Sequence, residues 1–154
     1  MTTSVGDALP VFELRDQDNQ TFRVDDVRGK PLVLFFYPKD ETAVCTAEAC
    51  SFRDAYSDFV ALGADVVGIS SDDVSSHGSF ANKHRLPYRL LADVDGRVRR
   101  LLGVPGALFG LGSGRVTYVV DRDGTVRHIH KGLLQSQQHV DEAITALRAL
   151  VKQA

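Results

Sequence analysis

The chain has 154 residues and two cysteines, and the segment around the cysteines has the features of a redox site. Cys45 and Cys50 lie in the stretch YPKDETAVCTAEAC, which follows the apolar run LVLFF. We expect a reducing compartment, in which a structural disulfide rarely persists. A cysteine pair there is more often reactive, metal-binding or simply buried. The residues around the pair have to decide between these alternatives.

Cys45 is expected in the first turn of a helix that follows a buried strand. Unpaired backbone N–H groups and the positive end of the helix dipole would stabilise a thiolate there. The hydroxyl of Thr42 can cap this helix and reach toward the sulfur or a bound oxygen, although capping alone would also explain the residue. Pro38 ends the strand and could shield the thiolate, or it could be a plain strand terminator. The segment therefore predicts a nucleophilic cysteine.

Cys50 is five positions after Cys45. On a continuous helix this spacing corresponds to a rotation of about 140° and a rise of about 7.5 Å, so the two sulfurs would not face each other. A disulfide needs Cα atoms within about 7 Å and converging Cβ directions. A Cys45–Cys50 disulfide would therefore require local unwinding of the helix, whereas two inert buried thiols would require nothing.

A metal or nucleotide cofactor is not expected. A Cys-x4-Cys pair lacks the two-residue spacing of zinc sites and no second pair exists. His128 and His130 share a strand face, and we interpret both as solvated side chains. Glycines 110, 112 and 114 precede a strand and do not fit Gly-x-Gly-x-x-Gly, which should open a helix.

The composition excludes several classes of partner. The 18 basic and 20 acidic residues are mixed along the chain and give a net charge of −2, so no positive field would attract nucleic acid or anionic lipid. No apolar run approaches the roughly 18 residues that span a bilayer, and the N-terminus has no basic leader. We expect a cytoplasmic protein of one domain over residues 1–154, because 44% of its residues are hydrophobic and no linker or repeat interrupts the chain.

The pattern of apolar residues indicates alternating strands and helices. In chain order we expect a hairpin of Val11–Leu14 and Thr21–Val24, a central strand Leu32–Tyr37, a helix over 44–62, a strand Asp65–Ser70, a helix Ser75–Arg85, a short helix near Gly96–Leu102, a flexible loop Pro105–Gly114, a hairpin of Arg115–Val120 and Thr125–His130, and a C-terminal helix with Val140, Ile144, Leu147 and Val151 on one stripe. This order predicts an α/β, thioredoxin-like fold, with a central mixed β-sheet flanked by helices and an N-terminal β-hairpin addition.

The cysteine segment also carries a family resemblance. Its pattern is Tyr-Pro-x-x-x-Thr-x-x-Cys, followed by Thr-x-Glu-Ala-Cys-x-Phe-Arg-Asp. The sequence resembles the peroxiredoxins, in particular the bacterioferritin-comigratory-protein or peroxiredoxin Q branch, over nearly the whole chain. It departs from that branch at Ala43-Val44, where Pro-Gly is common, and at Leu9, where Ala is common.

The resemblance implies a role for each motif residue. Cys45 would be the peroxidatic cysteine, and Cys50 would be the resolving cysteine that forms a redox-active disulfide with it. The substrate pocket around Cys45 would be formed by Pro38, Thr42, Val44, Glu48 and Arg115, with Thr42 and Arg115 as catalytic residues. Glu48 would help to orient Arg115.

The implied activity is a thiol-dependent peroxidase that reduces hydrogen peroxide and organic hydroperoxides in antioxidant defence. Thioredoxin or a similar dithiol would recycle it, and no cofactor would be needed. Because the resolving cysteine lies in the same helix, a monomer is expected. Three rivals stay open: a thiol–disulfide oxidoreductase, although Cys-x-x-Cys is absent, a non-catalytic redox sensor, and an inert scaffold.

Overall fold

The apolar run before Pro38 forms the middle of the sheet. The computed structural model describes residues 3–40, 42–105, 114–132 and 136–153. In it, β3 (Leu32–Phe36) is buried along its whole length. It pairs in parallel with β4 (Asp65–Ser70) and antiparallel with β6 (Val116–Val120). Strand side chains alternate between the two faces of the sheet. Val33 and Phe35 therefore enter one apolar core, and Leu32, Leu34 and Phe36 enter a second core on the opposite face.

Within the described residues, the sheet has seven strands in the order β2-β1-β5-β4-β3-β6-β7. The remaining strands are β1 (Glu13–Arg15), β2 (Thr21–Arg23), β5 (Arg89–Ala92) and β7 (Val126–Lys131). β5 is parallel to β4, and β7 is antiparallel to β6. The β1–β2 hairpin joins the sheet where Arg15 pairs with Ala92. This arrangement confirms the predicted thioredoxin-like α/β fold and its N-terminal hairpin.

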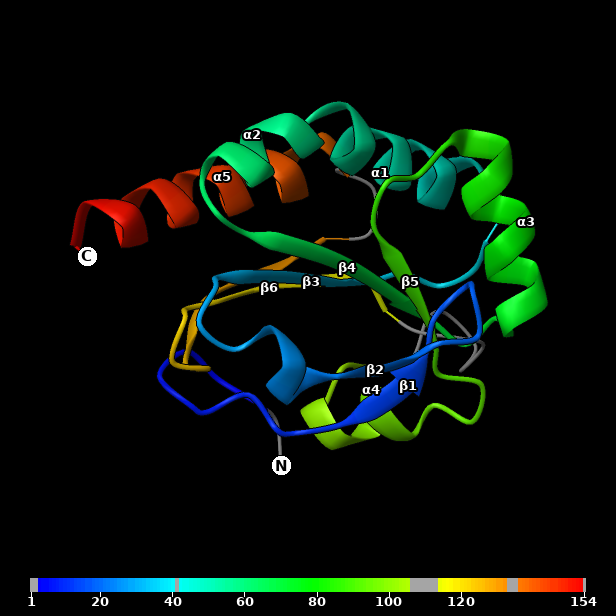
Figure 1. Ribbon diagram of the computed structural model, residues 1–154, viewed down its shortest axis with the longest axis horizontal. Coiled ribbons are helices and arrows are strands. Elements are labelled where there is room, and N and C mark those ends of the chain that lie inside the picture. The colour runs from blue at the N-terminus through cyan, green and yellow to red at the C-terminus, as the bar shows by residue number, and fades with distance from the viewer. Residues whose placement is uncertain (1–2, 41, 106–113, 133–135, 154) are drawn as a thin grey trace.

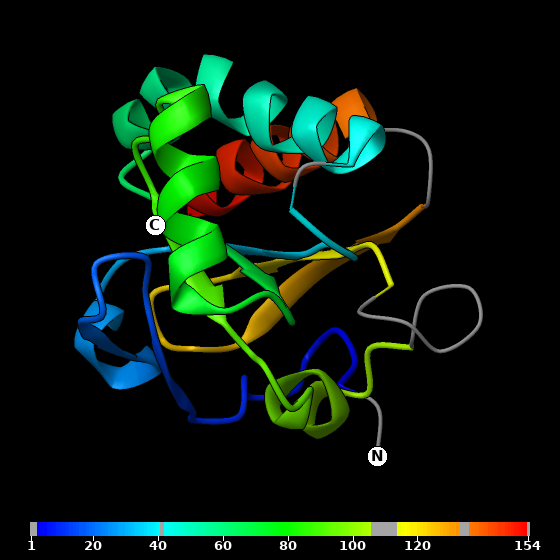
Figure 2. The same cartoon turned by 90° about the vertical axis from the view of Figure 1, so that its right-hand side faces the viewer.

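The helices are divided unequally between the two faces (Figures 1 and 2). One face is covered by α1 (Ala43–Asp54), α2 (Tyr56–Ala61), α3 (Val74–His84) and α5 (Ser136–Gln153). The hairpin, the 3-10 helix η1 (Val24–Val27) and α4 (Arg97–Leu102) cover the other face. In the described part of the chain, no helix is both long enough and apolar enough to cross a bilayer.

Several predicted elements need correction. The single helix expected over 44–62 is two helices, α1 and α2, separated at Ala55. The change of direction lets Phe52 stack on Phe35 and also pack against Phe59, with ring centroids 4.3 and 5.7 Å apart. η1 and β5 were not predicted, because four residues are too few to show a clear periodicity.

The C-terminal helix forms, but its predicted stripe is only partly buried. Val140 and Leu147 enter the core, whereas Val151 is 47% exposed and lines a surface hollow near the end of α5. Of the predicted loop Pro105–Gly114, residues 106–113 lie outside the described residues. The prediction for that loop is therefore untested.

Candidate active site

Cys45 lies in the first turn of α1, as predicted, and only 1% of it is exposed. β3 ends at Phe36, and the chain then crosses to the face covered by α1. Thr42 is the N-cap residue of α1, with an extended backbone (φ −84°, ψ 153°), and its carbonyl accepts the first helical hydrogen bond from the Thr46 N–H. Backbone N–H groups of this first turn have no partners within the helix, so the sulfur lies at the positive end of the helix dipole.

Arg115 connects Cys45 to Glu48. Its Nη2 donates to Cys45 Sγ at 3.3 Å, and its Nη1 donates to Glu48 Oε1 at 3.0 Å. Arg115 directly precedes β6, and the register that pairs Val116 with Phe36 brings it to the end of β3, next to the start of α1. Arg115 is 6% exposed and Glu48 is fully buried. The geometry therefore brings together three of the predicted site residues.

Glu48 is a carboxyl group that can change its charge near neutral pH. Burial raises the pKa of Glu48 from 4.5 to about 7, because the carboxylate is removed from water, and Arg115 offsets only part of this effect. Oε1 accepts from Arg115, whereas Oε2 has no hydrogen-bond partner among the described residues. His139 Nε2 lies 3.7 Å from Oε2.

His139 is a site residue that the sequence analysis missed. It is fully buried, with Nδ1 2.7 Å from Thr117 Oγ1 and Nε2 2.8 Å from the Gly132 carbonyl oxygen. Burial lowers the pKa of His139 from 6.5 to about 4, so the ring is neutral at pH 7. The only sequence signal was its spacing of four from Ala143 and eight from Leu147, both of which are core residues. That spacing places a histidine on an otherwise buried helix face.

The other predicted pocket residues are more exposed than Cys45, Glu48 and Arg115. Pro38 and Val44 are half-buried, and Thr42 is exposed. The expectation that the Thr42 hydroxyl caps α1 is wrong for this structure, because it donates to the Lys39 carbonyl at 3.1 Å instead. This short-range bond competes with capping.

Cys50 is partly buried, and both cysteines are free thiols. α1 is continuous from Ala43 to Asp54, so Cys45 and Cys50 keep their helical separation. The unwinding required for a disulfide stays a prediction.

A second buried polar cluster lies on the α3 side of β3. Asp40 accepts from the Tyr37 hydroxyl at 2.6 Å and from the Ser76 hydroxyl at 2.8 Å, and its Oδ2 is 2.8 Å from His77 Nδ1. The Asp40 N–H donates to Asp72 at 2.7 Å. Ligand atoms of Asp40, Asp72 and His77 lie within 4.8 Å of one another, as in a metal site, but they are already engaged in these hydrogen bonds. We therefore interpret the cluster as structural: its hydrogen bonds fix the loop before α1.

The predicted solvated histidines on β7 are in fact paired. His128 lies 3.3 Å and His130 3.6 Å from the carboxylate oxygens of Glu142 on α5. The His130 side chain is only 12% exposed, and its ring packs edge-on against His139 with centroids 4.5 Å apart. The prediction failed because α5 covers this strand face.

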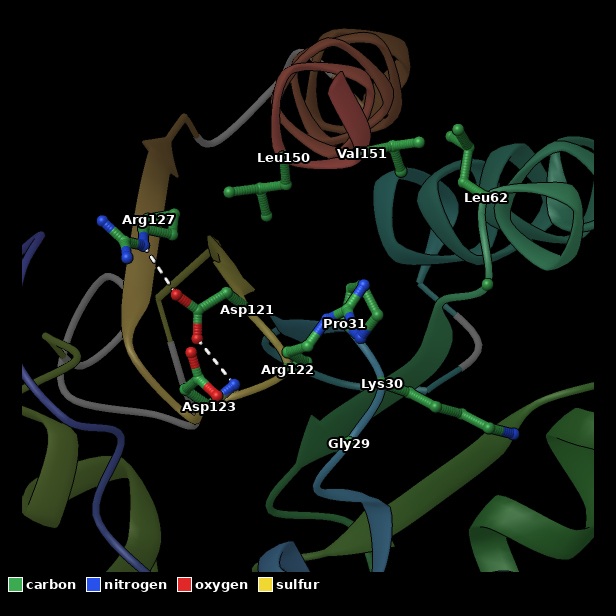
Figure 3. Close-up of a pocket in the computed structure, with 11 residues that line it drawn as sticks. Gly29, Lys30, Pro31, Leu62, Asp121, Arg122, Asp123, Arg127, Leu150 and Val151 are labelled. Carbon is green, nitrogen blue, oxygen red and sulfur yellow. Dashed lines mark hydrogen bonds and ion pairs between the residues drawn. The ribbon is translucent and has the colours of Figure 1, made fainter. Parts of the chain in front are cut away.

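A surface hollow of about 520 Å³ lies at the other end of the sheet (Figure 3). It is lined by the turn after β6, the segment before β3 and the end of α5. Two of its charged groups interact with each other, since Arg127 donates to Asp121 at 2.7 Å, and Asp121 also accepts two backbone N–H groups. Because Cys45 is at the opposite ends of β3 and β6, this hollow is not part of the cysteine site.

The fold and the site together define the class of thioredoxin-fold enzymes that use a cysteine at a helix start. Residues 5–129 match the AhpC/TSA family. The chain is also 49% identical to the chloroplastic peroxiredoxin Q of Gentiana triflora, over 95% of this chain and 67% of that protein. The chain therefore belongs to the AhpC/TSA family, as a peroxiredoxin of the peroxiredoxin Q type and hence a thiol-dependent peroxidase.

Solved structures agree with this assignment. The peroxidoxin BcpB of Mycobacterium tuberculosis superposes with a TM-score of 0.89 at 38% identity, covering 96% of this chain and 98% of that one. The bacterioferritin comigratory protein of Xanthomonas campestris, described for its alkyl peroxide reduction activity, superposes with a TM-score of 0.83 at 27% identity, covering 94% and 99%. The family resemblance drawn from the sequence is thus confirmed.

The expected cytoplasmic location is contradicted by the comparison. The Gentiana triflora relative and several others at similar identity are named as chloroplastic proteins. The expectation relied on the lack of a basic leader and of an apolar run long enough to span a bilayer. Neither feature distinguishes one reducing compartment from another.

Proposed function

We propose that Cys45 is the peroxidatic cysteine of this peroxidase and that Cys50 resolves its oxidised form. The observation that carries the assignment is the bond from Arg115 Nη2 to Cys45 Sγ at 3.3 Å, made by an arginine that also binds Glu48. A buried sulfur at a helix start with a guanidinium against it is stabilised as a thiolate. Cys50 is partly buried and lies five residues after Cys45 in α1. It can reach the Cys45 sulfur only if α1 unwinds.

In the first step, the Cys45 thiolate attacks one oxygen of the peroxide. A sulfur–oxygen bond forms, the oxygen–oxygen bond breaks, and the departing oxygen takes up a proton to leave as water or an alcohol. Negative charge moves from the sulfur to that oxygen, so donors must already face it. Arg115 and the first N–H groups of α1 are placed to stabilise this charge. Arginine suits the position because it stays charged and its planar fork presents several donors.

In the second step, the Cys50 sulfur attacks the Cys45 sulfenic acid. A disulfide forms and water leaves, so a dithiol must then reduce the protein. Thioredoxin or a similar protein is our proposal for that reductant. Because the helical spacing keeps the sulfurs apart, the turn from Cys45 to Cys50 has to unwind before they meet.

The substrate class follows from the relatives and the surroundings of Cys45. We propose hydrogen peroxide and alkyl hydroperoxides, supported by the alkyl peroxide reduction described for the Xanthomonas campestris protein. Pro38, Thr42 and Val44, on the segment that leads to the sulfur, would contact the substrate. The 154-residue chain would act as one domain and as a monomer, since both cysteines belong to one helix. A disulfide-linked dimer after oxidation would contradict the monomer.

The test is rapid mixing of the reduced protein with one equivalent of hydrogen peroxide. Peroxide loss, intact mass and thiol count would be followed, with Cys45→Ser and Cys50→Ser as variants. We expect fast loss that depends on Cys45, disappearance of both thiols, and a mass decrease equal to two hydrogens. Cys50→Ser should consume peroxide once and then overoxidise. Equal behaviour of the two variants would overturn the assignment of roles.

A further inference from the structure

The buried histidine on α5 lies behind the peroxidase site, and none of the steps above uses it. His139 is fully buried, as is Glu48, and His139 Nε2 lies 3.7 Å from Glu48 Oε2. Oε2 is the oxygen of Glu48 that lacks a hydrogen-bond partner among the described residues. A buried carboxylate oxygen without a partner is costly, so its nearest polar neighbour matters.

The hydrogen bonds of His139 determine which of its nitrogens carries a proton. The Gly132 carbonyl, 2.8 Å from Nε2, can only accept, so Nε2 must donate. The Thr117 hydroxyl, 2.7 Å from Nδ1, can donate, and a neutral ring with its hydrogen on Nε2 therefore satisfies both partners. Glu48 Oε2 lies 3.7 Å from the same Nε2, beyond hydrogen-bond distance, so its interaction with this N–H is electrostatic.

We propose that His139 is a positioning residue of the peroxidase site, which keeps the Glu48 carboxylate turned toward Arg115 so that Arg115 remains directed at Cys45. The proposal rests on the proposed role of Cys45. Glu48 bonds Arg115 through Oε1, and His139 lies beside the other oxygen. Thr117 and Gly132 fix the imidazole ring, so the carboxylate is held from both sides.

The charge of Glu48 makes this arrangement sensitive to pH. The charged or titratable groups around Glu48 are Cys45 on α1, Arg115 before β6, His139 on α5, with His130 of β7 behind it, and Tyr88 before β5. Of these, Arg115 and the N–H of His139 favour the carboxylate, whereas the negative Cys45 thiolate opposes it. Losing the His139 donor should raise the pH at which Glu48 ionises and Arg115 gains its full ion pair.

The experiment is the pH profile of the first peroxide reaction in His139→Phe and His139→Gln. In the Phe variant, we expect the acid-side midpoint of the profile to move up by about one pH unit, with a rate loss of about tenfold near pH 6.5 and a much smaller loss near pH 9. Glutamine can place an N–H close to the position of Nε2 and should restore most of the wild-type profile. An unchanged profile in the folded Phe variant would overturn the proposal.

Leu147→Ala is the matched control for lost packing. Leu147 is fully buried two turns further along α5 and belongs to the apolar core that this helix face covers. Its side chain has no polar group that could interact with Glu48. We expect it to lower stability without moving the pH midpoint, and the same shift in Leu147→Ala as in His139→Phe would overturn the proposal. If His139→Phe does not fold, Thr117→Val replaces it, because loss of the hydroxyl releases the ring. It should move the midpoint in the same direction by less.

The two proposals can fail separately. If the wild-type protein consumed peroxide no faster than the Cys45→Ser variant, the assignment of Cys45 would be overturned. A rapid, Cys45-dependent wild-type reaction with an identical pH profile in the His139 variants would overturn only the role of His139.

Discussion

Two buried histidines flank the cysteine segment, and their partners differ. His77 on α3 and His139 on α5 are both fully buried, on opposite sides of β3. The ring nitrogens of His77 face two acceptors, the Leu91 carbonyl at 2.9 Å and Asp40 Oδ2 at 2.8 Å. His139 faces one carbonyl and one hydroxyl, and a single proton satisfies both.

The comparison shows that burial alone does not decide what a histidine does. Because the second partner is a carboxylate, His77 holds the loop residue Asp40 in the buried cluster. A hydroxyl in the same place leaves His139 neutral, beside a chain of contacts that leads through Glu48 and Arg115 to the sulfur. We therefore expect substitutions around His77 mainly to lower folding stability. Substitutions around His139 should change the rate of the peroxide reaction and its pH dependence.

The largest stability effect is expected from Asp40→Asn. This change replaces one carboxylate oxygen of Asp40 with an N–H donor, so buried hydrogen bonds that the carboxylate accepts are lost, at a cost of about 3–5 kcal/mol. Urea unfolding of the reduced protein measures it. Asp54→Asn is the control, because Asp54 is 70% exposed in its ion pair with Arg53 and its loss should cost less than about 1 kcal/mol. Similar losses in both variants would remove the distinction between the two histidine sides.

Glu48 and His139 should contribute to folding stability with opposite dependences on pH. The pKa of Glu48 is raised from 4.5 to about 7 by folding, so its stabilising contribution is complete below about pH 4.5 and is lost as the pH rises through about 7. The pKa of His139 is lowered from 6.5 to about 4, so its contribution is complete above about pH 6.5 and is lost as the pH falls through about 4. Each contribution amounts to about 3 kcal/mol.

The corresponding measurement compares the free energy of unfolding of Glu48→Gln and His139→Gln with wild type between about pH 4 and pH 8. Relative to wild type, Glu48→Gln should gain about 3 kcal/mol as the pH rises, and His139→Gln should lose about as much. Asp54→Asn serves again as an exposed reference, with no slope expected above pH 5 or so. Difference curves with the same sign for both variants would contradict the assigned shifts.

Much of the reactive end of the molecule follows from local sequence. The continuous apolar run that stops at Pro38 predicted β3, and the helical spacing after it predicted the start of α1 at Cys45. The proximity of Arg115 to the sulfur was expected from the family resemblance, not from the pattern of residues, and the antiparallel pairing of β3 with β6 provides it.

The remaining site residues depend on contacts between distant segments. His139 approaches Glu48 only because α5 packs on α1, and His77 approaches Asp40 only because α3 returns over β5. The error at Thr42 has a local cause, since its hydroxyl had a choice between the helix start and the Lys39 carbonyl, and composition cannot rank these bonds. The break at Ala55 is set by aromatic packing in the core.

The smallest expected effect concerns the contact that restrains α1 near Cys50. Tyr88, which precedes β5, is buried, and its hydroxyl donates to the Ala49 carbonyl of α1 at 2.6 Å, next to Cys50. Unwinding of α1 as far as Cys50 has to break this bond. Tyr88→Phe should therefore lower stability by about 1 kcal/mol but speed disulfide formation about fivefold, as followed by thiol loss after a single peroxide addition. Tyr56→Phe is the control, since its ring packs 6.3 Å from that of Tyr88. A slower disulfide step in Tyr88→Phe would show that this bond positions Cys50 for the reaction and does not restrain it.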